Sequence, residues 1–167
     1  LYEQVIVVGV EKMSDYPTST VTSALAQAAD AEYEYIYGIS FPALNALAMR
    51  LYMLRYEARR EDLALWPVRM HEYGSKNPYA QLRNRITVED VLTSPIISDP
   101  IRLMDSAPIG DGAAVLLLAS EDVAKKVSDT PIEIAGIGLG SDGIDLSSRE
   151  DVLNPISVRK AAEKAFR

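Results

Sequence analysis

Three side chains stand out as candidates for proton transfer, and they are His71, Asp99 and Asp105. His71 is the only histidine, and it has no metal-spaced or triad partner, so we expect a structural role. Both aspartates lie in a proline-rich loop, where a carboxylate usually accepts backbone N–H groups. A general acid or base also needs a partner and a desolvating pocket. We therefore nominate no catalytic residue and no metal ligand.

The composition excludes several classes of protein. Cysteine is absent from the 167 residues, which excludes disulfide bonds and thiolate metal sites and is compatible with a reducing compartment. The net charge of -7 disfavours nucleic acid as a partner, because such binding requires a basic surface. No apolar run approaches the roughly 18 residues of a membrane span, and the first residues form no signal peptide. We expect a soluble, cytoplasmic protein that does not associate with a membrane.

Positive charge is concentrated between residues 50 and 85, which hold eight basic and four acidic side chains in an acidic chain. Such a patch attracts a polyphosphate ligand through charge-assisted hydrogen bonds. A solvated helix face with ordinary ion pairs explains the same pattern, and the sequence leaves both interpretations open. The basic residues are Arg50, Arg55, Arg59, Arg60, Arg69, Lys76, Arg83 and Arg85.

Apolar runs predict the strands that position these residues. Residues 5–13 and 111–119 are almost wholly apolar, which is typical of strands buried on both faces in an α/β fold. We expect these two strands in one sheet, although about a hundred residues separate them, with the intervening residues packed above the strand ends. Residues 132–139 predict a further strand.

Several helices are predicted between and after the strands. Pro42 begins a helix whose apolar residues extend beyond one face, so it should be largely buried. The next helix begins near Arg60, and Pro67 should kink it or end it near Trp66. Thr87 caps a short helix. The remaining helices are predicted from Thr18 or Thr20 to Ala29, over residues 123–127, and after Asn154-Pro155 with Val158, Ala161, Ala162, Ala165 and Phe166 facing inward.

Three motifs resemble the thiolase superfamily. Residues 9–14 read Gly-Val-Glu-Lys-Met-Ser, residues 77–81 read Asn-Pro-Tyr-Ala-Gln, and residues 108–114 read Pro-Ile-Gly-Asp-Gly-Ala-Ala. Together they are similar to the branch of archaeal acetyl-CoA acetyltransferases and sterol-carrier-type thiolases. The chain departs from the pattern at Ser106, where many relatives have cysteine, and at Pro67. The position of Ser106 is not that of the family's nucleophile.

The resemblance implies an α/β, thiolase-like layered sandwich that is incomplete, with a mainly helical loop-domain insertion between two core strands. Residues 1–13 would be a core strand of the first thiolase half, and residues 14–110 the loop domain covering coenzyme A. Residues 111–130 would form the last strand of that half with a connecting helix, and residues 131–167 the start of the second half. The family's catalytic cysteine and histidine segments have no counterpart in this chain, so the resemblance implies a central fragment that is inactive by itself.

The implied reaction is acyl transfer, with formation or thiolysis of acetoacetyl-CoA by an acetyl-CoA acetyltransferase. An acetyl-CoA or acyl-CoA thioester is then the substrate, no cofactor is implied, and the protein forms a homodimer or tetramer, alone or within a multi-enzyme complex. Two alternatives stay open, namely a non-catalytic acyl-CoA-binding or scaffold subunit of a thiolase complex, and a sterol-carrier-type 3-ketoacyl-CoA thiolase. The resemblance implies that coenzyme A contacts Phe41, Arg55, Arg59, Arg60, Ser106, Ala107, Pro108 and Ile109. It also implies a structural or substrate-shaping role for His71.

Overall fold

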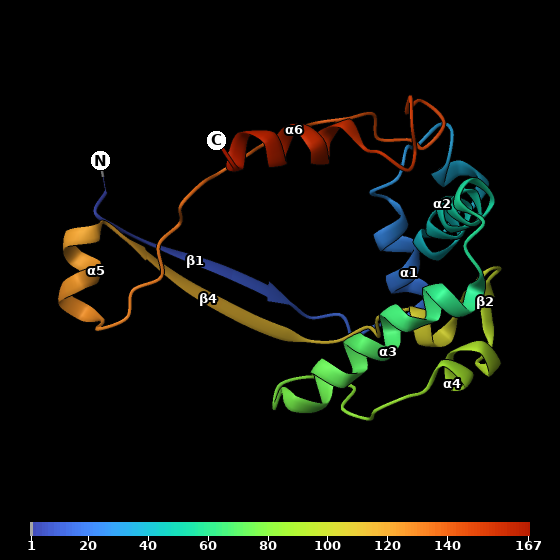
Figure 1. The fold of residues 1–167 in the computed structure, drawn as a ribbon, viewed down its shortest axis with the longest axis horizontal. Helices are drawn as coiled ribbons and strands as arrows, with labels where there is room; N and C mark the ends of the chain where they lie inside the picture. The colour runs from blue at the N-terminus through green and yellow to red at the C-terminus, as the bar shows by residue number, and fades with distance from the viewer. Residues whose placement is uncertain (1) are drawn as a thin grey trace. The chain divides into compact units, whose positions relative to one another are not determined.

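The computed structural model describes residues 2–167 and shows a mixed α/β chain (Figure 1), which confirms the predicted class. Leu1, the first residue of the expected 1–13 segment, lies outside the described residues. The elements follow in the order β1 (Gln4–Glu11), α1 (Thr18–Ala26), η1 (Tyr35–Tyr37), α2 (Phe41–Tyr56), α3 (Arg60–Lys76), α4 (Val88–Thr93), β2 (Ile96–Ser98), β3 (Ile101–Arg102), η2 (Leu103–Asp105), β4 (Gly112–Ala119), α5 (Glu121–Val127) and α6 (Ile156–Ala165).

The described chain forms two compact units, each discontinuous in sequence. The first unit contains residues 2–16, Ile109–Ser141 and Ile156–Arg167, and the second contains Pro17–Pro108 and Asp142–Pro155. The first unit therefore holds β1, β4, α5 and α6, and the second holds the remaining elements. The division into thiolase halves and loop domain remains a proposal.

In the first unit, β1 and β4 form a two-stranded antiparallel sheet (Figure 1). Their register runs continuously from the Gln4–Ala119 pair to the Glu11–Gly112 pair. This pairing confirms that the two distant apolar runs share one sheet. The expected burial on both faces is wrong for this chain, since every residue of β1 and all of β4 except Ala119 are exposed. The reason is that the described residues leave both faces of the pair uncovered.

Residues 132–139 are not the predicted strand but an extended segment that lies along α6 (Figure 1). Alternate glycines approach the helix backbone so closely that a Cβ atom at any of them would overlap a carbonyl oxygen of α6. Two extended residues advance about 6.6 Å and four helical residues about 6 Å, so alternate glycines match successive turns. An extended segment packed on a helix has no neighbouring strand, and no ladder forms. The contacting pairs are Gly136 with Ala165, Gly138 with Ala161, and Gly140 with Ser157.

These glycine contacts also determine which face of α6 is covered. Ala161 and Ala165 lie against the extended segment, and Lys164 Nζ donates a hydrogen bond to the Leu139 carbonyl at 3.0 Å. Val158 and Phe166, which were expected to face inward, are 64% and 91% exposed. The prediction was wrong because the glycines contact the helix backbone at Ser157, Ala161 and Ala165, and the larger apolar side chains stay outside this contact.

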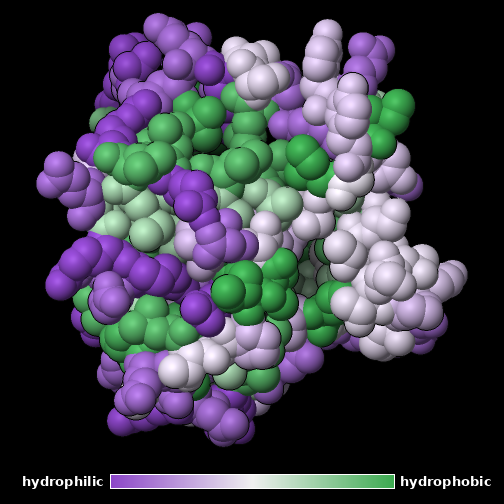
Figure 2. All heavy atoms as spheres, turned by 90° about the vertical axis from the view of Figure 1, so that its right-hand side faces the viewer, coloured by the Kyte–Doolittle hydropathy of each residue, from purple (hydrophilic) through white to green (hydrophobic). Residues whose placement is uncertain are grey.

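The second unit has a core of mostly small side chains. α2 begins at Phe41 with Pro42 in its first turn, as predicted, but of its residues only Ala46 is buried. Leu47 and Leu54 are 57% and 75% exposed, so the expectation of a largely buried helix is wrong. Figure 2 shows apolar side chains gathered at the surface of one face of the molecule. The buried apolar residues are Val21, Ala26, Ala29, Ala46, Ala64, Val91 and Ile101.

α3 continues through Pro67 to Lys76, so of the two expected outcomes, a kink or an ending near Trp66, the ending is wrong. Proline removes one helical hydrogen bond, but burial of its apolar ring is favourable. Pro67 is buried together with Ala64 on the same face of the helix, which offsets the lost bond. The predicted caps are confirmed at α4, where the Thr87 hydroxyl accepts the Asp90 N–H and the Asp90 carboxylate accepts the Thr87 N–H.

The close glycine packing predicts that Gly138→Val weakens the attachment of α6. A valine side chain would overlap the Ala161 carbonyl, and overpacking of this kind costs about 1–3 kcal/mol. Amide hydrogen exchange should therefore become faster throughout α6. Gly9→Ala is the matched control, since a Cβ atom at Gly9 meets nothing within 4 Å. Equal exchange in α6 of both variants would contradict the packing described here.

Candidate functional site

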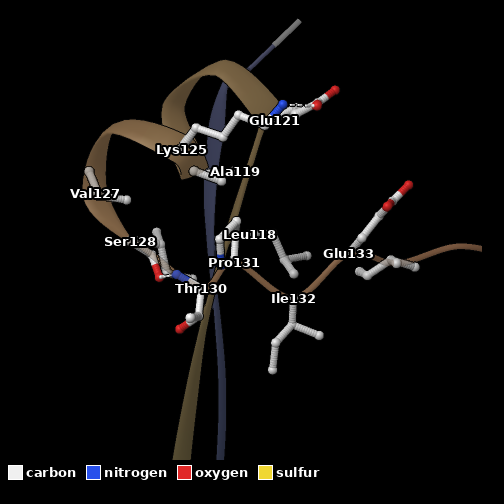
Figure 3. Close-up of a pocket in the computed structure, with 13 residues that line it drawn as sticks. Leu118, Ala119, Glu121, Lys125, Val127, Ser128, Thr130, Pro131, Ile132 and Glu133 are labelled. Atoms are coloured by element: carbon white, nitrogen blue, oxygen red, sulfur yellow. Dashed lines mark hydrogen bonds and ion pairs between the residues drawn. The ribbon is translucent and has the colours of Figure 1, made fainter.

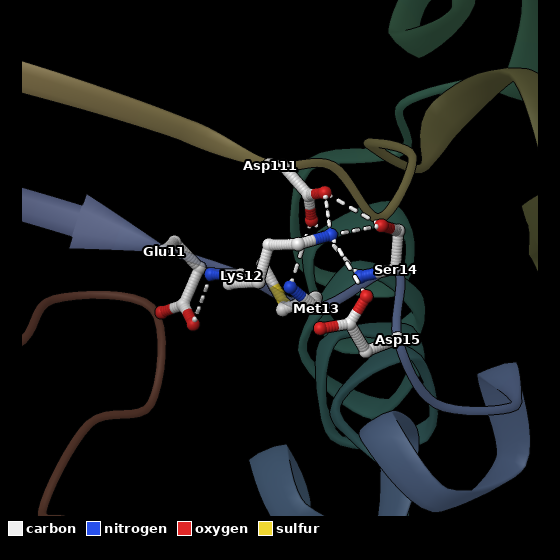
Figure 4. A network of polar contacts seen from close by, with 6 residues as sticks. All are labelled: Glu11, Lys12, Met13, Ser14, Asp15 and Asp111. Carbon is white, nitrogen blue, oxygen red and sulfur yellow. Dashed lines mark hydrogen bonds and ion pairs between the residues drawn. The ribbon is translucent and has the colours of Figure 1, made fainter.

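A polar network centred on Asp111 ties the end of β1 to the start of β4 within the first unit (Figure 4). Asp111 Oδ1 accepts the backbone N–H groups of Met13 and Ser14, both at 2.9 Å. Asp111 Oδ2 accepts the Ser14 hydroxyl and Lys12 Nζ, both at 2.5 Å. Lys12 Nζ also lies 3.0 Å from Asp15 Oδ1. One carboxylate thus fixes three consecutive residues of the chain that leaves β1.

The charge states in this network decide what chemistry it can perform. Lys12 Nζ donates to Ser14 Oγ at 2.7 Å, a contact that resembles a lysine activating a serine nucleophile. Activation requires a neutral lysine, but hydrogen bonds to Asp111 and Asp15 raise the pKa of Lys12. Hydrogen bonds from Lys12 and then Ser14 hold the pKa of Asp111 well below its usual range. The network is therefore a charged anchor and not a nucleophile with its base.

A second anchor lies in the second unit, at the start of α3. Arg60 forms an ion pair with Asp105 of η2, and the two side chains are only 14% and 12% exposed. Arg60 Nε also donates to the Pro100 carbonyl at 3.2 Å. Asp105 Oδ2 accepts the Arg102 N–H at 2.8 Å, so Asp105 does accept a backbone group as the sequence suggested. Arg60 Nη1 is buried without a hydrogen-bond partner among the described residues.

The other two candidate arginines also have carboxylate partners. Arg55 Nη1 lies 2.8 Å from both oxygens of Asp151, and this pairing raises the pKa of Arg55. Arg59 donates to Asp62 from Nε at 3.1 Å and from Nη2 at 3.0 Å, and its pKa is raised by that contact. A phosphate that approaches either guanidinium must share it with the carboxylate already there.

The rest of the basic segment divides into paired and unpaired side chains. Arg50 pairs with Asp99, while Arg69 and Lys76 both contact Glu72. Such pairs agree with the interpretation of the segment as a solvated helix face with ordinary ion pairs. Arg83 and Arg85 are exposed in the coil before α4 and form no ion pair within residues 2–167. These are the cations of the segment that a ligand could engage without competition.

The residues expected to line the pantetheine arm lie at two places. Phe41 is the first residue of α2 and is half-buried. Ser106 follows η2 and donates its N–H to the Leu103 carbonyl at 3.1 Å, while Ala107 and Pro108 are exposed. Ile109 is the first residue of the chain's return to the first unit. Of the three candidate arginines, Arg60 is the one linked to this loop, through Asp105, the residue before Ser106.

His71 lies on α3, where its Nδ1 is 2.9 Å from the Asn84 carbonyl oxygen. This contact joins α3 to the coil that follows it. No carboxylate pairs with the imidazole among the described residues. The arrangement suits a structural residue, and a substrate-shaping role remains a proposal.

A cavity of about 620 Å³ lies elsewhere in the first unit, between the end of β4, α5 and residues 130–134 (Figure 3). Its charged lining residues are Glu121, Lys125 and Glu133, and Lys125 pairs with Glu121 across one turn of α5. The cavity therefore offers no uncommitted cation to a phosphate, and none of the predicted coenzyme A residues lines it. We place no functional site there.

Residues 2–167 contain no cluster of three or more His, Cys, Asp or Glu side chains arranged to hold a metal ion. Within the same residues, no helix combines the length and hydrophobicity needed to span a bilayer.

The sequence pattern predicts a strand over residues 111–119 and does not reveal the Asp111 network. The participating residue types are visible in the sequence, as Lys-Met-Ser after one apolar run and Asp-Gly before another. Only the antiparallel pairing of β1 with β4 brings these groups, 97 to 99 positions apart, into contact. If antiparallel pairing of the two apolar runs had been assumed, it would have predicted that Asp111 lies beside residues 12–14.

Comparisons with known proteins agree with the motifs. Residues 2–122 match the family described as "Thiolase, N-terminal domain". The chain is 40% identical to the acetyl-CoA acetyltransferases of Methanothermobacter thermautotrophicus and Methanocaldococcus jannaschii, over 99% and 98% of its length. Sterol carrier protein 2 of Gallus gallus is 26% identical over the whole chain. The chain spans 43%, 42% and 33% of these relatives.

Solved structures show a related fold. One described as "Ltp2-ChsH2(DUF35) aldolase" superposes with a TM-score of 0.78 at 22% identity. The superposition covers 99% of this chain and 45% of the other. At this identity the likeness concerns the fold.

The Asp111 network predicts a specific pH dependence of stability. Because the folded-state pKa of Asp111 lies below the unfolded value of about 3.9, the network stabilises the fold above that pH. Its contribution is lost as the pH falls through the folded-state pKa. The free energy of unfolding of the wild type should therefore fall more steeply between about pH 5 and pH 2 than that of Asp111→Asn. Asp15→Asn, which removes a contact to Lys12 alone, is the control, and parallel curves for wild type and Asp111→Asn would contradict the assignment.

Proposed function

Since the chain belongs to the thiolase family, whose N-terminal domain it matches over residues 2–122, we propose that it is part of a thiolase-type acyl-CoA acyltransferase. The proposed activity is that of an acetyl-CoA acetyltransferase, which forms or cleaves acetoacetyl-CoA. The observation that carries this proposal is the 40% identity to two archaeal acetyl-CoA acetyltransferases along nearly the whole chain. The substrate would be an acetyl-CoA thioester, with no additional cofactor.

The proposed reaction needs groups that this chain does not contain. A thiolase transfers an acyl group to a cysteine thiolate, and a base forms the carbanion that attacks the acyl group. The 167 residues include no cysteine, so the nucleophile would come from another part of the protein. This chain would then supply the cover over coenzyme A and part of the sheet. The exposed apolar faces of β1 and β4 support a layered sandwich in which other segments cover them.

Coenzyme A would use the second unit and the loop that leaves it. We propose that the phosphates lie near the basic segment, with Arg55, Arg59 and Arg60 as the contacting groups. Arg59 is 73% exposed, which makes it more accessible to a phosphate than Arg60, at 14%. Phe41 and residues 106–109 would line the pantetheine arm, since thin apolar arms suit walls with few polar anchors.

A sterol-carrier-type 3-ketoacyl-CoA thiolase is the second candidate function. The matches to sterol carrier protein 2 support it, but their identity of 26 to 29% is well below that of the archaeal enzymes. A non-catalytic acyl-CoA-binding subunit of a thiolase complex is a third possibility, favoured only by the lack of cysteine in this chain. A homodimer or tetramer is the assembly we propose in each case.

An activity assay of the isolated chain tests whether the 167 residues can catalyse the reaction by themselves. The purified 167-residue chain should form no acyl-enzyme and should not cleave acetoacetyl-CoA in the presence of coenzyme A. The full-length protein, if it is a thiolase, should do both and should lose both when its nucleophilic cysteine is replaced. Turnover by the isolated chain that His71→Ala abolishes would contradict this division of roles.

The proposed phosphate contacts are tested by neutral substitutions in the full-length protein. Arg55→Gln or Arg59→Gln should weaken acetyl-CoA binding by about 1.5–3 kcal/mol if the guanidinium contacts phosphate. The difference from wild type should shrink as salt screens the contact. Arg69→Gln, which removes a similarly exposed ion pair with Glu72, is the matched control. Equal affinities for all these proteins by calorimetry would show that the basic segment is only a solvated face.

A further inference from the structure

The dipeptide Asp-Gly occurs twice in the chain, at residues 111–112 and 142–143. In such a dipeptide the glycine nitrogen can attack the side-chain carboxyl carbon of the aspartate and close a succinimide ring. Glycine favours this attack because it has no Cβ atom to hinder the approach and its backbone adopts many conformations. The two dipeptides lie in different surroundings, so the structure determines which of them can react.

At Asp142-Gly143 the reacting groups are already close together. The Gly143 N–H donates to Asp142 Oδ1 at 2.8 Å, which holds the nitrogen beside the carboxyl group that it would attack. Asp142 is exposed, so water can reach and leave the carboxyl group. Both residues belong to the second unit. Reacting atoms held this near to each other give up little further freedom on the way to the transition state.

The residues that follow hold Gly143 in this position. Arg149 Nε donates to the Gly143 carbonyl at 3.1 Å, and a Cβ atom at Gly143 would lie 2.3 Å from Ser148 Oγ. Ser148 is fixed in turn, because its N–H donates to the Asp145 carboxylate at 2.7 Å. The glycine is thus packed against its own loop while its N–H points to Asp142.

At Asp111-Gly112 the same reaction is opposed by ionisation and by geometry. Ring closure needs a protonated carboxyl group, because water leaves far more readily than hydroxide. Hydrogen bonds, from Lys12 above all, hold the pKa of Asp111 well below its usual range and keep the carboxylate ionised. Its two oxygens accept groups of residues 12–14, which direct it toward that segment. Gly112 is the first residue of β4, whose pairing with β1 fixes its backbone.

We propose that Asp142-Gly143 is a site of spontaneous isoaspartate formation and that Asp111-Gly112 is protected from it. The Gly143 nitrogen forms a bond to Asp142 Cγ and gives up its proton, while the protonated carboxyl group gives up its hydroxyl, so that one water molecule leaves. A second water molecule then opens the ring. Where it attacks the main-chain carbonyl carbon, the peptide bond runs through the former side chain, and the backbone contains one additional methylene group.

The longer backbone would begin a loop that the second unit holds by a main-chain bond. The Leu146 N–H donates to Glu34 Oε1 at 2.8 Å, and Glu34 is only 5% exposed. A methylene group inserted at residue 142 displaces the residues that follow it relative to Glu34. Local opening of residues 144–150 should therefore become easier, and amide hydrogen exchange reports such opening.

The test ages the full-length protein at neutral pH, either folded or in guanidinium chloride, and measures isoaspartate in peptides that contain Asp111 or Asp142. Electron-transfer fragmentation in a mass spectrometer distinguishes the two isomers. In the folded protein, isoaspartate should accumulate at least about tenfold faster at Asp142 than at Asp111. In guanidinium chloride, where neither geometry persists, the two rates should agree within about twofold. Equal rates in the folded protein, or folding that slows Asp142 as much as Asp111, would overturn the proposal.

Two variants test the chemistry at residue 142. Asp142→Glu should form no isomer, because its longer side chain closes a less favourable ring. Asp142→Asn should form the same succinimide with loss of ammonia, and its deamidation should be at least as fast in the folded protein as in guanidinium chloride. Slower deamidation in the folded protein would show that the native geometry does not favour the attack, and the proposal would fail.

Amide hydrogen exchange of residues 144–150 supplies a second readout that needs no enzymatic activity. Exchange should become faster in aged wild type, in proportion to the isoaspartate formed, and should stay unchanged in aged Asp142→Glu. Unchanged exchange in wild type that carries isoaspartate at residue 142 would overturn the effect on the loop.

Discussion

The Asp111 carboxylate joins chain segments that lie up to 99 positions apart in the sequence. Its bonds to Lys12, Met13 and Ser14 fix the end of β1 against the start of β4. The eight-residue register of the two strands continues from this point, and a slip by one residue would turn every side chain to the opposite face. The chain leaves the first unit shortly after Ser14 and returns to it shortly before Asp111. One carboxylate therefore links the register of the sheet to both ends of residues 17–108, the longest stretch of chain in the second unit.

Charge in the second unit is largely committed to internal pairs. Arg55, Arg59 and Arg60 each have a carboxylate partner, although the local excess of basic residues suggested free cations. The Arg59–Asp62 pair lies within one helix. The Asp151 partner of Arg55 and the Asp105 partner of Arg60 come from distant segments. The two long-range pairs hold the loop of residues 142–155 and η2 in place. Their primary effect is thus architectural, and a bound phosphate would gain only what the carboxylates do not already satisfy.

The apolar strands raise a different physical question. A two-stranded sheet is only marginally stable in water, and exposed apolar faces add no burial energy. Both faces of the β1–β4 pair are exposed, while the chain spans less than half the length of its archaeal relatives. The sandwich we propose would resolve this by covering the faces with other segments. The extended residues 132–140 solve the same problem locally, because glycines let a helix pack directly on the backbone.

Local sequence determined the elements whose signals are short in range. The two apolar runs, the Pro42 helix start, the Thr87–Asp90 capping box and the family motifs all depend on neighbouring residues, and each is found where it was predicted. The strand expected at residues 132–139 was wrong because a strand requires a partner, and periodicity does not reveal whether one exists. Burial was also misjudged, since it depends on what covers a face and not on the face itself.

Tertiary structure decided the pairing of charges and the location of the anchors. Asp111 meets Lys12 only because β1 and β4 run antiparallel, and Arg60 meets Asp105 only because α3 packs beside η2. Hydrogen bonds between groups 45 to 99 positions apart carry no local signature, because the energy of each depends on three-dimensional geometry alone. The sequence by itself therefore determined the family, the α/β class and the residue types available for binding. The fold decided which of those residues hold the chain in place.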